Sequence, residues 1–407
     1  LAPDPPALHA PVTIAAAFDQ RLLTMQDMRL TIDDTGMTKV EARKPNAKVA
    51  VGCKSTEVVS WFVDRVRTVG QQSLPAAPKN LSKLVERGAF PAKVHVAEDY
   101  DTNIEKRWWM AGKYALTGVV GRDQNRCCRG VLTQDFDDRQ GNLKTSYRAV
   151  IFNPVPGPPM GKNTHLSFRY KLTGTDKLRV QLYSLTNGYH RYLSLAGLPQ
   201  GEWRSGTVDM TQMRRPDGSG GPLSENERID DIQFYVDPRA ELLIDDIVLY
   251  EAAVPGEKRP FPKRILFTAW FDTGKQGKEW PGDFAIVNHD KPRTWKAARS
   301  VVNPMTKEPW IRLHLRGERR LGVPTELTLK YHLVGADKMR VELAHAKGQR
   351  SLSKELKDLA RDAWSDATLR FEIPHSDSDE NWADEIRFIV PAGATLTIDD
   401  VLLYLPG

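Results

Sequence analysis

Residues Thr164–Leu182 read THLSFRYKLTGTDKLRVQL, and residues Thr325–Leu343 read TELTLKYHLVGADKMRVEL. The two stretches are identical at 10 of 19 positions. A second phrase, IDDIVLY at Ile244–Tyr250, recurs as IDDVLLY at Ile398–Tyr404. A duplication of this kind predicts two copies of one structural unit within the 407-residue chain.

The offset between equivalent residues shrinks along the chain. It is 171 residues at Asp101, 161 at Trp203 and 154 at Ile232. The second copy is therefore the first with shorter connections. Connections that vary while the elements persist are expected to be surface loops.

Within each copy the hydrophobic residues alternate with polar ones. Every second residue of Leu166–Leu172 is apolar, and Leu178–Tyr183 repeats the pattern. Alternation of this kind indicates half-buried antiparallel strands, and Gly174-Thr175-Asp176 lies where such a pair must turn. The fold class is predicted to be mainly β, with two tandem antiparallel β-sandwich domains over residues 90–252 and 260–407.

Residues 1–80 lie outside the duplication. Met28–Ile32, Met37–Ala42 and Lys48–Cys53 have strand-like patterns, and Ser55-Thr56-Glu57 is a helix start. We predict a small α+β or docking segment that ends in a Pro-rich linker. Such a segment could engage other protein subunits.

Three further phrases of the first copy recur in order in a known family. They are Glu98-Asp99-Tyr100-Asp101, Gly201-Glu202-Trp203 and the closing strand Ile244–Tyr250. With the alternating strand pair, they resemble the jelly-roll carbohydrate-binding modules of the galactose-binding-like superfamily, over about residues 90–251 and 261–405. The resemblance implies jelly-roll sandwiches that bind a polysaccharide or other glycan, although the same sandwich also serves as a spacer or protein-binding module.

Composition narrows the remaining classes. The sequence contains no run of 18 apolar residues, so it predicts no membrane-spanning helix. Its net charge of +6, without a basic cluster or a nucleic-acid motif, argues against a nucleic-acid-binding protein. The chain begins Leu1-Ala2-Pro3, which suits a secreted or cell-surface protein, with the periplasm also open. Cys53 could pair with Cys127 or Cys128, or all three could be free thiols.

The sequence holds no motif of a hydrolase, metalloprotease or nucleotide-binding enzyme. Its acid pairs, such as Asp245-Asp246, are sequence neighbours, which point to opposite faces of a strand and cannot flank one glycosidic bond. We therefore predict a non-catalytic protein. A glycan lyase or hydrolase remains the third class, with Tyr183, His190 and Arg179 as its nearest candidates.

The resemblance also implies a structural calcium ion between the first and last strands of at least one module. Hard cations bind carboxylate oxygens. The positions that match are Asp99, Asp101 and Asp246 in the first copy, with Asp272 and Asp400 in the second. These aspartates could instead cap turns.

Sugars are held by aromatic faces and by planar polar side chains. With alternate residues in the core, the outward residues of the strands and of the loop Leu185–Tyr192 supply both kinds. Cationic side chains among them favour an acidic or sulfated glycan. The alternatives are a solvated charged face, or a subunit of an extracellular fibre, surface layer or larger complex that buries this face. The predicted ligand-binding residues are Arg169, Arg179, Gln181, Tyr183, Tyr189, His190, Arg191, Tyr192 and Tyr235, with Arg312, His314 and Arg340 in the second copy.

Overall fold

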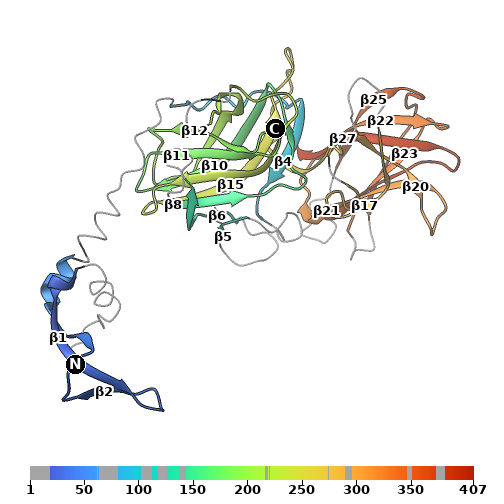
Figure 1. Cartoon of the computed structure of the whole chain (residues 1–407). Helices are drawn as coiled ribbons and strands as arrows, with labels where there is room; N and C mark the ends of the chain where they lie inside the picture. The colour runs from blue at the N-terminus through green and yellow to red at the C-terminus, as the bar shows by residue number, and fades with distance from the viewer. Residues whose placement is uncertain are drawn as a thin grey trace. The chain divides into compact units, whose positions relative to one another are not determined.

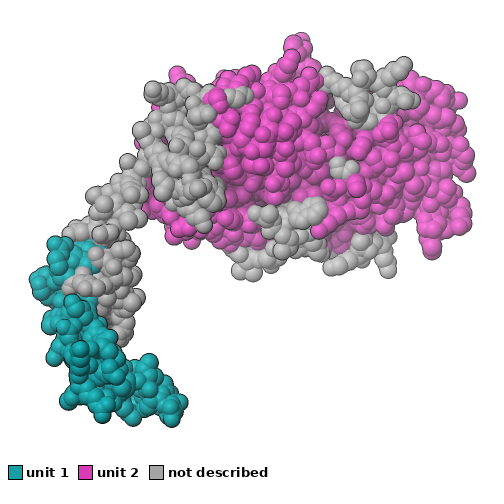
Figure 2. Space-filling model, viewed as in Figure 1, with its two compact units in different colours: residues 1–77 teal, residues 78–407 magenta. Residues whose placement is uncertain are grey.

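A computed structural model gives the fold of the chain (Figure 1). It divides into two compact units, residues 1–77 and residues 78–407 (Figure 2). The structure describes residues 19–61, 63, 81–101, 112–117, 126–136, 144–215, 219, 221–273, 275–288, 296–345, 351–372 and 381–407.

The first unit contains a three-stranded antiparallel sheet in the order β2-β1-β3. Asp33 accepts hydrogen bonds from the amides of Thr35 and Met37 at the turn between β1 and β2. Leu22 and Val58 form the buried cluster among its described residues, whereas Ile32 is 73% exposed. Docking of a protein partner here stays a prediction. The elements are η1 Gln20–Leu22, β1 Leu23–Ile32, β2 Thr38–Glu41 and β3 Ala47–Cys53, and residues 55–61 are helical.

The second unit opens with a sandwich of two antiparallel sheets, here called the first sandwich. One sheet has the order β13-β10-β15-β6-β5, with β4 paired to β15; the other has the order β12-β11-β14-β8-β7, with β9 paired to β14. The elements are β4 Lys93–Glu98, β5 Ala115–Leu116, β6 Cys128–Arg129, β7 Val131–Phe136, β8 Lys144–Phe152, β9 Pro159–Met160, β10 Thr164–Thr173, β11 Leu178–Ser184, β12 Tyr189–Leu195, β13 Arg204–Asp209, η3 Met210–Gln212, β14 Glu227–Val236 and β15 Glu241–Glu251.

The second sandwich repeats this arrangement. One sheet has the order β18-β19-β27-β22-β25, with β16 paired to β27; the other has the order β17-β21-β26-β23-β24, with β20 paired to β21. The elements are β16 Arg264–Ala269, β17 Gly282–Asp283, β18 Ala285–Asn288, β19 Lys296–Arg299, β20 Val301–Val302, β21 Pro309–Arg320, β22 Thr325–Val334, β23 Met339–Ala344, β24 Ser351–Leu356, β25 Trp364–Phe371, β26 Trp382–Ile389 and β27 Thr395–Leu405.

Each sandwich has its own hydrophobic core, built from the predicted alternation. Leu166, Phe168 and Tyr170 of β10 lie in the first core, and Leu327, Leu329 and Tyr331 of β22 lie in the second. The mainly β, two-sandwich fold class is confirmed. Among the described residues, none belongs to a helix that has the length and apolarity needed to cross a membrane.

The closing strands depart from simple alternation. Asp246 has φ 46° and Asp400 has φ 45°, so each strand bulges at the second aspartate of its pair. The bulge resets the period, and Ile244 and Ile247, three residues apart, both enter the first core. Asp245 is buried at 2% exposure, whereas the side chain of Asp246 is 40% exposed, so the two aspartates of this pair lie in different environments.

All three cysteines are free thiols, so no disulfide joins them. Cys53 lies at the end of β3, whereas Cys127 and Cys128 are buried beside β6. Burial raises the pKa of the Cys127 thiol. Of the two alternatives from the sequence, the structure has the unpaired one.

Candidate functional site

The outer face of the sheet that contains β11 gathers most of the predicted ligands of the first sandwich. Arg179 lies opposite Tyr235 of β14, while Gln181 and Tyr183 lie opposite Tyr192 and His190 of β12. Because Val180 and Leu182 point into the core, the alternate residues point to the other side. Arg169 is not part of this group, since β10 belongs to the opposite sheet.

Arg179 is enclosed by aromatic rings. Its guanidinium carbon lies 4.6 Å from the ring centre of Tyr147, 4.8 Å from that of Tyr235 and 5.5 Å from that of Tyr192. Each ring face attracts a cation. Tyr147 of β8 was missed in the sequence, although the alternation in Tyr147–Phe152 would have placed it outward with Ala149 and Ile151.

Next to this cage lies a chain of neutral hydrogen bonds. Gln181 Nε2 donates to Gln233 Oε1 at 2.9 Å, and the same oxygen accepts the Tyr235 hydroxyl at 2.8 Å. Gln181 is 5% exposed, Tyr235 is 2% exposed and Tyr192 is 7% exposed. These three side chains face outward but are buried against their neighbours, and their part in ligand binding stays a prediction.

Residues Tyr189 to Tyr192 do not form the predicted contact loop. They begin strand β12, so their side chains alternate, and Arg191 points away from Tyr192. Arg191 Nε lies 2.8 Å from Glu227 Oε1, and the two side chains are 2% and 0% exposed. Tyr189 is partly exposed, and its hydroxyl accepts a hydrogen bond from Arg191 at 3.0 Å. Arg191 is therefore a structural residue.

The corresponding face of the second sandwich is charged and partly exposed. Arg312 of β21 lies 2.8 Å from Asp283, and His314 and Arg312 both face Glu385 of β26. Arg340 of β23 pairs with Glu342 at 3.1 Å. The structure brings all three predicted ligands of this copy to one face. Each of them already has a carboxylate partner, so the face offers little net attraction to an anion.

A groove of about 400 Å³ lies on the other sheet of the first sandwich and extends onto the start of the second sandwich. We call it the seam groove. It is lined by hydroxyl groups of Ser167, Ser205 and Thr207 and by seven charged side chains. The charged residues are Arg87, Arg169, Lys263, Arg264, Glu98, Asp99 and Asp246.

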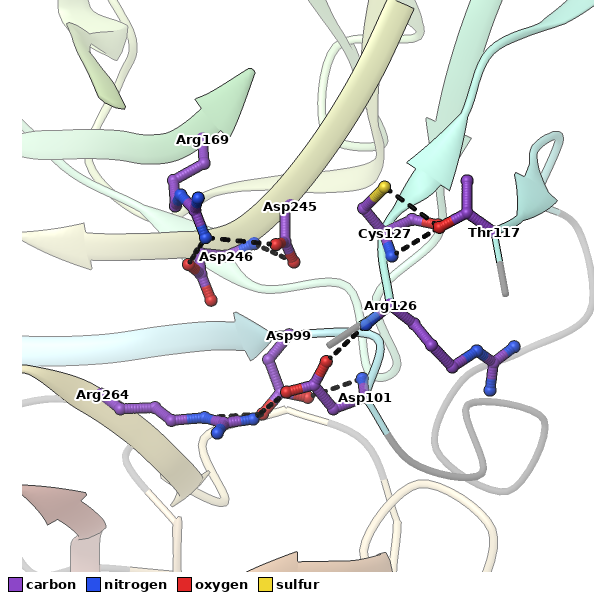
Figure 3. Close-up of polar contacts among 9 residues, drawn as sticks. All are labelled: Asp99, Asp101, Thr117, Arg126, Cys127, Arg169, Asp245, Asp246 and Arg264. Atoms are coloured by element: carbon purple, nitrogen blue, oxygen red, sulfur yellow. Dashed lines mark hydrogen bonds and ion pairs between the residues drawn. The ribbon is translucent and has the colours of Figure 1, made fainter. Parts of the chain in front are cut away.

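Some cations of the seam groove are paired with carboxylates, and others are not. Arg169 Nη1 lies 3.4 Å from Asp246 (Figure 3). The guanidinium carbon of Arg169 lies 5.0 Å from the ring centre of Trp203. Arg264 bonds Asp99. Arg87 and Lys263 are exposed and form no ion pair with any residue that the structure describes. The groove thus presents two cations without a carboxylate partner among the described residues, and the guanidinium carbon of Arg87 lies 4.0 Å from the ring centre of Phe261.

The five aspartates predicted to bind calcium lie near the boundary between the sandwiches. Asp99 and Asp101 form ion pairs with Arg264, and Asp272 and Asp400 form ion pairs with Lys93. Asp246 faces Arg169. Within the described ranges, no three His, Cys, Asp or Glu side chains converge as a metal site would require. These carboxylates meet basic side chains, which fits poorly with a divalent ion among them.

Asp245 is a buried acid of this region whose pKa is strongly raised. Burial, followed by the charge of Asp246, raises its pKa to about 8. A raised pKa in the folded state means that the protonated form favours folding. This contribution to stability is complete below the unfolded pKa of about 3.9 and is lost as the pH rises through about 8.

We expect Asp245→Asn to remove this loss of stability at high pH, since the amide of asparagine has the shape of the carboxyl group without its charge. The gain in melting temperature over the wild type should be small near pH 5 and larger near pH 8.5. Asp237→Asn is the control, because the pKa of Asp237 is lowered by Arg239 and its effect should be equal at both pH values. Parallel pH profiles for the wild type and Asp245→Asn would show that this carboxyl group is ionised throughout.

Comparison with known proteins gives structural likenesses only. No protein-family model and no curated protein matches the chain. The chain is similar to the tandem of two family 22 carbohydrate-binding modules from Xyn10C of Paenibacillus barcinonensis, at 11% identity and a TM-score of 0.26, over 79% of this chain and 100% of that one. It is also similar to the family 11 carbohydrate-binding module of the cellulase Lic26A-Cel5E of Clostridium thermocellum, at 18% identity and a TM-score of 0.28, over 40% and 97%. Likenesses at these TM-scores do not assign a ligand to this chain.

Proposed function

We propose that the chain binds a polysaccharide without cleaving it, and that the seam groove binds an acidic or sulfated glycan. The observation that carries the proposal is the pair of exposed cations, Arg87 and Lys263, on the rim of a groove of about 400 Å³. Carboxylate and sulfate groups form strong, charge-assisted bonds with such side chains. The hydroxyl of Ser205, which is exposed, adds a partner for sugar hydroxyls.

The groove suits this role better than either predicted face. In the first sandwich, the Gln181 and Tyr235 side chains are buried and bonded to their neighbours. In the second, Arg312 and Arg340 are matched by carboxylates at 2.8 and 3.1 Å. A ligand would have to break these interactions before it gained new ones, whereas Arg87 and Lys263 have no carboxylate partner to give up among the residues that the structure describes.

The proposal includes no catalysis. Tyr183 and His190 stack edge to face across β11 and β12 at 5.0 Å, while Arg179 lies within its aromatic cage. These residues share a packed sheet face and line none of the described grooves. Action outside the cell stays a prediction from the sequence.

Replacing Arg87 and Lys263 together by alanine should weaken binding to an acidic polysaccharide at least tenfold. A hydrogen bond to a charged group contributes about 1.5–3 kcal/mol, and about 1.4 kcal/mol corresponds to a factor of ten. Binding is measured by affinity electrophoresis against polygalacturonate, heparin and a neutral β-glucan. Wild-type binding should also weaken as salt is raised, because the screening length is roughly 8 Å at physiological ionic strength.

The control variant is Arg361→Ala. Arg361 is a surface cation of the second sandwich, paired with Asp337 at 2.7 Å and remote from the lining of the groove. The Arg361→Ala substitution lowers the net charge of the chain without changing the lining of the groove. Equal weakening by Arg361→Ala would mean that overall charge drives binding. Absence of binding to every polysaccharide, together with self-association of the purified chain, would favour the assembly subunit.

A further inference from the structure

Each sandwich places one basic side chain against aspartates of the other sandwich. Lys93 begins β4 and Arg264 begins β16, and the offset of 171 residues between them also relates Asp101 to Asp272. Lys93 Nζ lies 2.6 Å from Asp272 and 2.9 Å from Asp400 of the second sandwich. In the opposite direction, Arg264 Nη2 lies 2.6 Å from Asp99 and bonds Asp101 of the first (Figure 3). The Lys93–Asp272 and Arg264–Asp101 pairs are thus equivalent.

The aromatic contacts at the same boundary are also reciprocal. The Phe90 ring meets the Tyr404 ring edge to face at 5.2 Å, and the Phe261 ring meets the Tyr250 ring at 4.9 Å. Phe90 and Phe261 are equivalent by the 171-residue offset, and Tyr250 and Tyr404 by the 154-residue offset. These four rings belong to a hydrophobic cluster shared by both sandwiches, which also contains Val94, Val248, Ile265 and Leu402.

The backbone follows the same symmetry. Ala89 and Pro260 form an antiparallel bridge, and the Phe90 amide donates to the Arg259 carbonyl oxygen at 2.9 Å. In an isologous interface, the form found in two-fold symmetric dimers, every contact has a symmetric counterpart. If residue i of one copy contacts residue j of the other, then residue j of the first copy contacts residue i of the second. The surface made by the first and last strands of one sandwich therefore meets the equivalent surface of the other.

We propose that the second unit is a fused dimer of self-complementary sandwiches, in which Lys93 and Arg264, each supplied by the opposite sandwich, take the place expected for calcium. The side chains of Lys93, Asp272 and Asp400 are 17%, 12% and 14% exposed. An ammonium group between two carboxylates leaves no cage of six to eight oxygens for calcium. Removing one member of a largely buried ion pair leaves the other charges uncompensated, so the loss of Lys93 or Arg264 should weaken the contact between the sandwiches.

The first test asks about the metal. The melting temperature of the full chain should be unchanged by excess chelator and by added calcium. Lys93→Met should lower it, and Lys93→Arg should retain most of the wild-type value, because the equivalent position 264 already uses arginine. A wild-type melting temperature that rises with calcium and falls with chelator would overturn the proposal.

The second test asks about the interface. A protease site inserted between Pro255 and Gly256, which are exposed in the connection between the sandwiches, allows the full chain to be cut after folding. The two pieces should then elute together in gel filtration at micromolar concentration, with chelator present. The cut Lys93→Met/Arg264→Met variant should elute as two separate pieces.

Lys330→Met is the matched control. Lys330 lies 2.7 Å from the same Asp400 but belongs to the same sandwich, so its loss should leave the cut pieces associated. Circular dichroism of each cut variant shows whether both sandwiches stay folded. Separation of the wild-type pieces, or continued association of folded Lys93→Met/Arg264→Met pieces, would overturn the proposal.

Discussion

The free energy of unfolding of an Arg191→Met variant should be roughly 3–5 kcal/mol lower than that of the wild type. Arg191 and Glu227 are both almost completely buried, with 2.8 Å between Nε and Oε1. Arg191 also donates to the carbonyl oxygen of Gly221 at 2.7 Å. The substitution leaves the Glu227 carboxylate buried without its partner, which is the costly state. Urea denaturation followed by tryptophan fluorescence measures the change.

Two further variants separate burial from charge. Arg204→Ala removes an arginine whose side chain is 51% exposed and paired with exposed Glu202, so its effect should stay below about 1 kcal/mol. Arg191→Met combined with Glu227→Leu should recover much of the loss, because no buried charge remains. A loss below about 1 kcal/mol for Arg191→Met alone would show that Arg191 reaches solvent and could contact a ligand after all.

Phe90→Ala should destabilise the second unit by about 3–5 kcal/mol, the usual result of truncating a buried phenylalanine. Phe90 is 7% exposed and contacts residues of both sandwiches, including the ring of Tyr404. Because the shared cluster couples the two cores, its truncation should also split one calorimetric transition of residues 78–407 into two.

Phe371→Ala provides the comparison, since Phe371 is 5% exposed and belongs to the second core alone. It should lower the stability of the second sandwich and leave the coupling between the sandwiches unchanged. If Phe90→Ala and Phe371→Ala gave the same calorimetric profile, the cluster would not couple the two cores.

Much of the fold could be predicted because local patterns decide it. The alternation in β10 and β22 placed Leu166 and Leu327 in the two cores, and turns follow at Gly174 and Gly335 with φ of 81° and 79°. Glycine adopts this backbone conformation at no steric cost because it has no Cβ atom. The bulge at Asp246 could not be read from a period of two, because an aspartate with positive φ looks like any other residue in a strand.

The candidate site was harder to predict because it depends on contacts between distant segments. Alternation correctly brought Arg179 and Tyr235 to one face, but it could not show that the face is packed by its own side chains. Arg191 looked like part of a loop, and its partner Glu227 is 36 residues away. Lys93 and Arg264 carried a signal that was overlooked, since a cation recurs at the same position of each copy, opposite acids that also recur.

The central claim, that an acidic glycan binds in the seam groove, is tested most directly by hydrogen–deuterium exchange of the full chain with and without an acidic oligosaccharide. We expect slower exchange in peptides that cover residues 84–99, 163–173 and 260–268, which line the groove. Peptides of β21 and β26 in the second sandwich should exchange as before. Slower exchange confined to β21, β23 and β26, with none at Arg87 or Lys263, would contradict the account.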